Sequence, residues 1–294
     1  MLSYEFMRLA LVAAVLVGLT APTVGVHLVQ RRLSLIGDGL GHMALLGVAI
    51  GLATRSAPVL TALATAVAGA LLVELLRHRR SASADVALAV LFYGGIAGGV
   101  VVVSRAPAGT PANLDSYLFG ALTTTTRGDL VVFAAMAVGV LAVTIGLSRQ
   151  LFTIAVDEEY AAASGLPVLR LDLLLATVTA GTVVLSMRVL GLLLISALMV
   201  LPAACARLVA PSFRSSLGVA ALVGVSTSVG GTVVSFHADT PSGATIVLTA
   251  IAAFGLLAAG RLVLRRPLPR LRPPGRPAQG APPAAATPEL RLPG

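Results

Sequence analysis

LIGDGLGHMALLGVAIG, residues 35–51, is the stretch that decides the fold of this chain. It is apolar and rich in glycine, and it approaches the ~20 residues that cross the hydrocarbon core of a bilayer. Yet it carries Asp38 and His42, which at helical spacing share one face, one turn apart. Ionisable side chains at membrane depth are rare and by default mark a pathway or ligand site. Carboxylate and imidazole are also ligands that divalent transition metals accept.

The composition of the whole chain is that of an integral membrane protein. Of its 294 residues 57% are hydrophobic and only 11% are charged, and the mean hydropathy is +0.95, far from the values of a soluble domain. Apolar runs of membrane-spanning length recur, and a helix satisfies its own backbone in lipid. We therefore predict an all-α integral membrane protein, a polytopic bundle of about nine transmembrane helices in contact with the lipid bilayer.

One transmembrane domain is expected over residues 1–264. The expected helices lie at about 6–29, 35–53, 58–76, 85–103, 130–147, 171–187, 190–208, 217–236 and 244–264. The apolar run 171–208 is expected to form two helices, because a single helix of that length would greatly exceed the membrane thickness. A tight turn near Met187 to Gly191 would separate them. The segment 117–126 is too short to span. Residues 148–170 are expected to form a polar coupling loop, and the Pro/Ala/Arg-rich residues 265–294 a disordered tail.

The distribution of arginine predicts the orientation. The net charge of +9 comes entirely from arginine, since the chain has no lysine. Most arginines up to Arg266 fall in the links after the first, third, fifth, seventh and ninth helices. The positive-inside rule then places the N-terminus outside and the tail in the cytoplasm. The arginines are thereby explained as topology signals, and no nucleic-acid partner is expected.

A second cluster of polar side chains lies in the short link 237–243, which contains His237 and Asp239. Each cluster also has a purely structural explanation, because Asp38 and Asp239 can cap the helices that follow them. Two such clusters in so charge-poor a chain nevertheless favour a path for a divalent metal. Zinc accepts these ligands in a tetrahedral site and manganese in a larger one, and the sequence does not separate the two.

The polar loop contains a candidate docking element. Asp157, Glu158 and Glu159 suit the first turn of a short helix, and Gly165 suits its end. Three carboxylates among arginine-rich loops would give a partner a distinct patch. The chain has no G-x-x-x-x-G-K-[ST] phosphate loop. We therefore expect a transport subunit that is not itself an enzyme, with ATP hydrolysis supplied by a partner subunit.

With these residues in view, the chain resembles the permease subunit of zinc/manganese ABC importers, the high-affinity zinc permease type. The resemblance covers about residues 9–264 and rests on four motifs: residues 37–49, 117–120, 188–204 and 239–243. Glu159, Ala161 and Gly165 also fit the E-x-A-x-x-x-G pattern by which ABC permeases present a coupling helix to their ATPase.

The resemblance implies a homodimer of this chain in the cytoplasmic membrane of a prokaryote. Two ATPase subunits would bind its cytoplasmic side, and an extracytoplasmic metal-binding protein would deliver Zn²⁺ or Mn²⁺ to its outer face. The metal is the transported substrate, and no cofactor is expected to remain bound. Asp38 and His42 match the metal pair of the family's second helix, and Asp239 matches its late aspartate, with His237 as a weaker candidate.

Two rival functions and one question about the site remain open from sequence. A permease of similar architecture for a chelated metal or corrinoid would need a wider path and no direct Asp or His ligands. A proton-coupled secondary transporter would use Asp38 and His42 as a proton relay. The predicted topology puts this pair towards the cytoplasmic end of its helix and Asp239 near the outer surface. The metal then either meets them in succession, or the elements fold so that all three meet.

Overall fold

The chain is built from helices alone in the part that the structure describes. The structure is a computed structural model, and it describes residues 4–79, 84–105, 120, 127–192 and 194–264. The helices are α1 (Glu5–Gln30), α2 (Ile36–Ala53), α3 (Pro58–His78), α4 (Ala84–Ser104), α6 (Arg127–Gly146), α7 (Ser148–Val156), α8 (Glu158–Ala163), α9 (Val168–Leu190), α10 (Ile195–Val209), α11 (Phe213–Ala238) and α12 (Ser242–Leu264).

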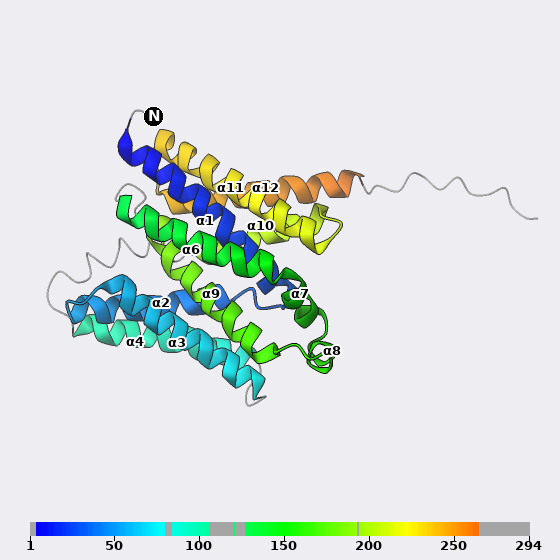
Figure 1. The fold of residues 1–294 in the computed structure, drawn as a ribbon. Coiled ribbons are helices and arrows are strands. Elements are labelled where there is room, and N and C mark those ends of the chain that lie inside the picture. Colours follow the sequence, from blue (N-terminus) through cyan, green and yellow to red (C-terminus); the bar gives the residue numbers. More distant parts are fainter. Residues whose placement is uncertain (1–3, 80–83, 106–119, 121–126, 193, 265–294) are drawn as a thin grey trace, which may run out of the picture.

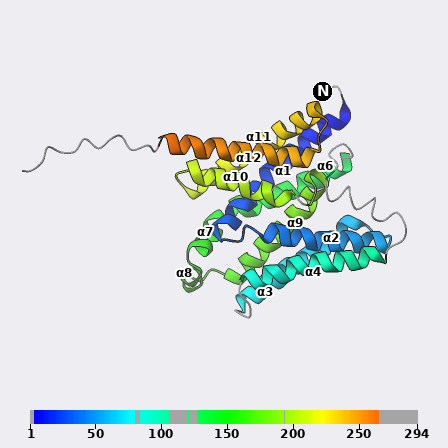
Figure 2. The same ribbon diagram turned by 180° about the vertical axis from the view of Figure 1, so that it is seen from behind.

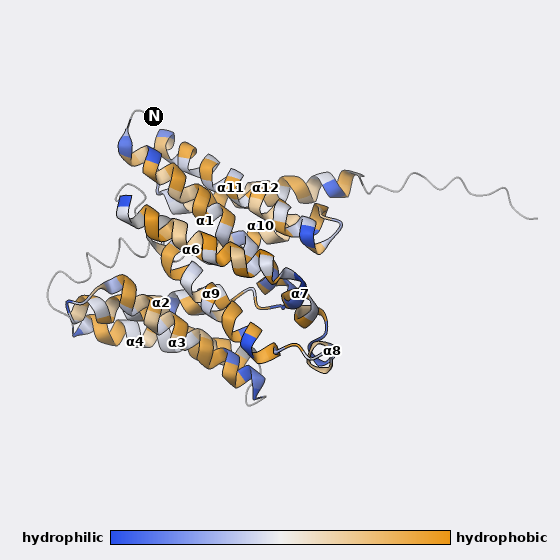
Figure 3. Ribbon diagram, in the orientation of Figure 1, coloured by the Kyte–Doolittle hydropathy of each residue, from blue (hydrophilic) through white to orange (hydrophobic). Residues whose placement is uncertain are grey.

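Seven of the described helices are long and apolar enough to cross a membrane: α1, α2, α3, α4, α9, α11 and α12. The bent pair α6 and α7, whose axes differ by 58°, gives an eighth span if it is counted as one, and α10 is a shorter apolar helix. Hydrophilic residues gather at helix ends and around α7 and α8, whereas apolar residues cover the helix bodies (Figure 3). The described residues therefore form the polytopic all-α bundle that the composition predicts.

The helices pack in two groups with α6 and α9 between them (Figures 1 and 2). One group consists of α2, α3 and α4, with α2 packed against both of its neighbours. The other consists of α1, α10, α11 and α12, with α1 packed against α10 and α11. Because α9 contacts α3 on one side and α1 on the other, it joins the two groups.

Glycines allow α1 to approach its neighbours closely. A Cβ at Gly18 would lie 2.8 Å from the carbonyl oxygen of Gly224 in α11, and one at Gly25 would overlap the backbone of Met199 in α10. Small residues permit this backbone-to-backbone packing, which supplies much of the association between helices in lipid. The centre of this group is therefore fixed by glycine positions on α1.

Two of the expected ranges require correction. The helix expected at 190–208 begins at Ile195, because Gly191 takes a positive φ of 84° and ends α9. The loop expected at 148–170 contains the short helix expected there, α8, but also α7 and the start of α9, so it is largely helical. The tail 265–294 lies outside the described residues, as does the segment 117–126 apart from Gly120.

Candidate functional site

Asp38 and His42 are half-buried on α2, which packs between α3 and α4. A Cβ at Gly95, near the midpoint of α4, would lie 2.7 Å from the carbonyl carbon of His42, and one at Gly69, near the midpoint of α3, would lie 3.1 Å from the Met43 side chain. The His42 turn is thus level with the middle of both neighbouring helices. The pair is near the start of α2, as expected.

The Asp38 carboxylate opens onto a pocket of about 300 Å³ between α2 and α4. Leu88, Ala89, Phe92 and Tyr93 of α4 form its opposite wall. One turn further along α2, the imidazole of His42 packs at 74° against the Phe92 ring, with the ring centroids 4.4 Å apart. Its Nδ1 atom is buried and has no hydrogen-bond partner. An unpaired nitrogen at this depth is costly unless a ligand or water satisfies it.

Asp239 and His237 lie elsewhere, where the chain turns from α11 to α12. Asp239 caps α11 in the left-handed conformation, with φ 50° and ψ 43°, and its side chain is exposed. It lines a pocket of about 410 Å³ with Phe6 and Met7 from the start of α1. His237 is exposed and packs its ring against Phe236. The structure does not bring these residues to the Asp38/His42 pair.

The described residues contain no group of three or more His, Cys, Asp or Glu side chains placed to hold a metal ion. Asp38 and His42 alone supply two ligands, whereas zinc in proteins is normally four-coordinate. A metal at this pair would therefore take its remaining ligands from water, from another molecule or from another copy of the chain.

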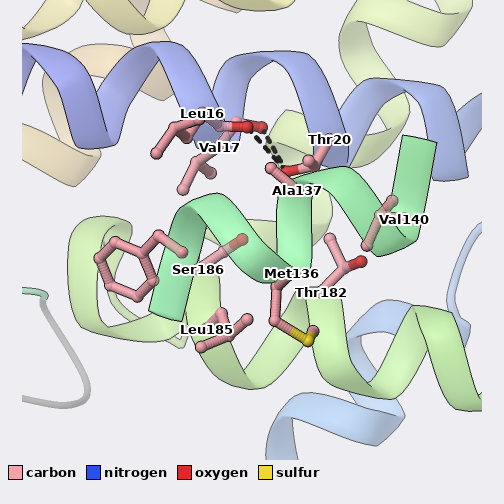
Figure 4. Close-up of a pocket in the computed structure, with 10 residues that line it drawn as sticks. Leu16, Val17, Thr20, Met136, Ala137, Val140, Thr182, Leu185 and Ser186 are labelled. Carbon is pink, nitrogen blue, oxygen red and sulfur yellow. Dashed lines mark hydrogen bonds between the residues drawn. The ribbon is translucent and has the colours of Figure 1, made fainter. Parts of the chain in front are cut away.

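The interior between α1, α6 and α9 is closed to a hydrated ion. The cavity there is about 20 Å³ and is lined by apolar side chains together with Thr20, Thr182 and Ser186 (Figure 4). That volume holds about one water molecule. The larger pockets lie instead beside Asp38, beside Asp239 and beside α8.

The residues expected to form a coupling element are together on α8. Asp157 caps this helix, its carboxylate accepting a hydrogen bond from the Tyr160 backbone N–H at 2.8 Å. Glu158 and Glu159 occupy its exposed first turn. Ala161 is fully buried on the opposite side, and Gly165 takes a φ of 81° just after the helix. The short helix thus exposes its acidic first turn and packs its other side against apolar side chains.

The apolar side chains beneath α8 belong to α7 and α9. Ala161 packs into a small apolar cluster with Leu151 and Ile154 of α7 and with Val168, Leu171 and Leu175 of α9. A pocket of about 420 Å³ opens between α8 and the end of α3, where Arg77 and His78 face Glu158 and Glu159. A displacement of α8 would therefore change its packing against α7 and α9 and the pocket that it shares with α3.

A buried cluster of charges lies behind this surface. The spacing of Glu74 and Arg77 predicts their ion pair, but the part around Asp172 was not predicted. Asp172 in the first turns of α9 is 2.7 Å from the guanidinium of Arg31, at the end of α1, and 2.9 Å from that of Arg77, in α3. Arg77 also donates to Glu74 through its Nε at 3.0 Å. The Asp172 side chain is 1% exposed and that of Arg31 is 5% exposed. The signal that could have found Asp172 is a lone carboxylate in an otherwise apolar helix, since such charges usually pair inside the bundle.

Comparison with known proteins places the chain in a family. It is 31% identical to the manganese transport system membrane protein MntC of Halalkalibacterium halodurans, over 87% of each chain. It is 29% identical to the high-affinity zinc uptake system membrane protein ZnuB of Haemophilus influenzae, over 83% of this chain and 94% of the relative. A solved structure, PsaBC from Streptococcus pneumoniae in complex with Fab, superposes with a TM-score of 0.75 at 27% identity, covering 87% of this chain and 92% of the other.

The model of one protein family spans almost all of the helical region. The description of that family is the ABC 3 transport family, and the match extends over residues 3–260. It therefore includes α2 with Asp38 and His42, the coupling element and the Asp239 turn. The chain belongs to the ABC 3 transport family, the family of metal ABC permeases that its sequence resembles.

Proposed function

We propose that this chain is the membrane-spanning permease of an ATP-driven importer for a divalent transition metal, Zn²⁺ or Mn²⁺. The relatives named above as manganese and zinc transport proteins support the metal, and the family supports an ABC transporter. Import would proceed by alternating access, in which the path opens first to the outer side and then to the cytoplasm.

The observation that carries the proposal is the Asp38/His42 pair at the mid-depth of the bundle. Asp38 faces an open pocket, and the buried Nδ1 of His42 lacks a partner. A carboxylate and an imidazole one helical turn apart can hold one divalent ion together. Asp239, near the start of α1, would meet the metal earlier on its path, so the two clusters would act in succession.

The end of the bundle that carries α8 would be cytoplasmic, with the N-terminus outside. This orientation is supported by Arg31, Arg77 and Arg79, which lie near that end. The acidic first turn of α8 would dock on a cytoplasmic ATPase dimer, and the Asp239 end would receive metal from an extracytoplasmic binding protein. A second copy of the chain would complete the path, because one copy brings only two ligands to the mid-depth site.

Transport by the purified complex in proteoliposomes tests this function. Uptake of free Zn²⁺ or Mn²⁺ is expected to require ATP and the ATPase partner, and to persist when an ionophore collapses the proton gradient. Uptake driven by a proton gradient without ATP would overturn the proposal in favour of a secondary transporter. Uptake of a metal chelate or corrinoid, with no uptake of the free ions, would overturn it in favour of the other permease class.

A further inference from the structure

The helix α4 contacts His42 through two residues that have no ionisable group. Its segment 88–99 runs beside α2 from Asp38 to Leu46, and Leu88, Leu91, Phe92, Gly95 and Gly98 lie next to α2 residues. Among these, Phe92 and Gly95 are three positions apart, so they share one face of the helix. Both touch His42, one its ring and the other its backbone.

Gly95 allows the backbones of α4 and α2 to approach at the His42 turn. A Cβ at this position would lie 2.7 Å from the His42 carbonyl carbon, 2.8 Å from the Met43 nitrogen and 2.9 Å from the His42 oxygen. These are backbone atoms, so any side chain here must push the two helices apart. A Cβ at the preceding Gly94 would meet nothing within 4 Å. The requirement for glycine is therefore specific to one of two adjacent positions.

Phe92 restricts the imidazole itself. Its ring lies 4.4 Å from that of His42 at an angle of 74°, a tilted geometry that aromatic pairs favour. The same ring lines the pocket that Asp38 faces, so it forms a wall shared by both members of the pair. Because phenylalanine offers no hydrogen bond, it holds the imidazole without occupying either of its nitrogens.

We propose that Phe92 and Gly95 are positioning residues that fix the His42 imidazole for the metal and thereby set the apparent affinity of transport. The proposal rests on the proposed function of Asp38 and His42. A preorganised ligand binds more tightly because less conformational freedom is lost when the ion arrives. If α4 moves away from α2 or loses the Phe92 ring, the imidazole gains orientations that do not face the metal, while the α8 surface proposed to bind the ATPase is unchanged.

The test compares Phe92→Leu and Gly95→Ala with two matched controls on the same helix, Val90→Ala and Gly94→Ala. Each variant is reconstituted with its ATPase partner, and the KM and maximal rate of ATP-dependent uptake are measured with Zn²⁺ and with Mn²⁺. Phe92→Leu is expected to raise KM about three- to tenfold, the range of an aromatic contact, with little change in maximal rate. Gly95→Ala is expected to raise KM more. Both controls should remain within about twofold of wild type, since Val90 is exposed and does not line the pocket and Gly94 faces open space.

A complex that carries His42→Ala, measured in the same assay, distinguishes failure of the positioning role from failure of the proposed function. If His42→Ala abolishes uptake but Phe92→Leu and Gly95→Ala keep the wild-type KM, the positioning role is wrong and the proposed function stands. If His42→Ala transports normally, the proposed function fails and the positioning role fails with it. Should Gly95→Ala not assemble with the ATPase, the comparison of Phe92→Leu with Val90→Ala decides. A raised KM in both of these, or in neither, would overturn the role of the ring.

Discussion

Asp172 shows at the residue scale how this bundle holds charge inside an apolar protein. Its carboxylate contacts Arg31 and Arg77 from two other elements, and Glu74 balances the second of these arginines. Two arginines and two acids leave no net charge in the cluster. Burying charges is tolerated under this condition, whereas removing one partner leaves the others uncompensated. Because Arg31 directly precedes the short link into α2, the cluster also anchors the element that carries Asp38.

We therefore expect Asp172→Asn to destabilise the permease by about 3–5 kcal/mol, the usual cost of breaking a buried ion pair on one side. The amide keeps the size of the side chain but removes the negative charge between two arginines. Thermal unfolding of the purified protein in detergent measures the effect. Asp239→Asn is the matched control, because Asp239 is exposed and asparagine also adopts the left-handed conformation found there. Equal unfolding temperatures for the two variants would show that the buried cluster does not stabilise the fold.

At the scale of elements, α8 joins the exposed acidic surface to the charge cluster. The helix has only six residues, so it depends on packing rather than on its own hydrogen bonds. Ala161 supplies that packing against α7 and α9, while Glu158 and Glu159 remain on the outer side. The pocket between α8 and α3 places these acids near Arg77, which in turn reaches Asp172. A movement of α8 could thus be transmitted to α9 through Ala161, and from Asp172 of α9 to Arg31, just before α2.

Charge reversal on this helix should weaken ATPase binding. With Glu158→Arg and Glu159→Arg combined, the dissociation constant is expected to rise about five- to tenfold, because exposed charge pairs contribute roughly 0.2–1 kcal/mol each. Titration of the purified ATPase onto immobilised permease measures it, and the loss should shrink at high salt. Glu5→Arg, an exposed reversal at the opposite end of α1, is the control. An unchanged dissociation constant in the double variant would contradict docking at α8.

The depth of α2 is the feature of this element that the sequence did not reveal. Hydropathy predicts how long a membrane helix is, but it does not say at which level the helix begins. The arginines Arg31 and Arg32 suggest a link at the membrane surface, and the predicted site was accordingly placed near the cytoplasmic end. In the structure Arg31 turns inward to Asp172, and α2 starts level with the first turns of α4. The end of α1 that leads into α2 is thus held by an ion pair whose acid partner lies 141 positions away in the chain, a contact that hydropathy does not predict.

At the scale of the whole molecule, the sequence predicted the fold class and the family but not the arrangement of the site. The fold class and the family could be predicted from the length of the apolar runs and from the motifs around Asp38 and Asp239, because these are local properties of the sequence. The boundary of α10 was missed since it depends on the positive φ of Gly191, and the helix α7 was missed because it is short and only partly apolar. The buried charge cluster and the Phe92 contact arise from packing between distant segments. The roles of Asp38, His42, Asp239 and α8 in transport remain predictions.

The two polar ends of the molecule indicate the direction in which the metal would move in the proposed function. The start of α1 and α8 lie at opposite ends of the bundle (Figure 1). The pocket beside Asp239 includes the start of α1, and the pocket beside Glu158 and Glu159 adjoins α8. A metal that enters beside Asp239 would reach the pair before it reaches the ATPase side. In the proposed function this order would make the Asp38/His42 pair an obligatory step in transport.

ATP-dependent metal uptake by Asp38→Ala and His42→Ala complexes tests that claim most directly. Removing a ligand that touches the ion should cost at least the ~10- to 100-fold that loss of an outer partner costs in metal sites. We predict that uptake of both Zn²⁺ and Mn²⁺ falls by about 100-fold or more in each variant, while the ATPase still co-purifies at the wild-type ratio. Wild-type uptake by both variants would contradict the account.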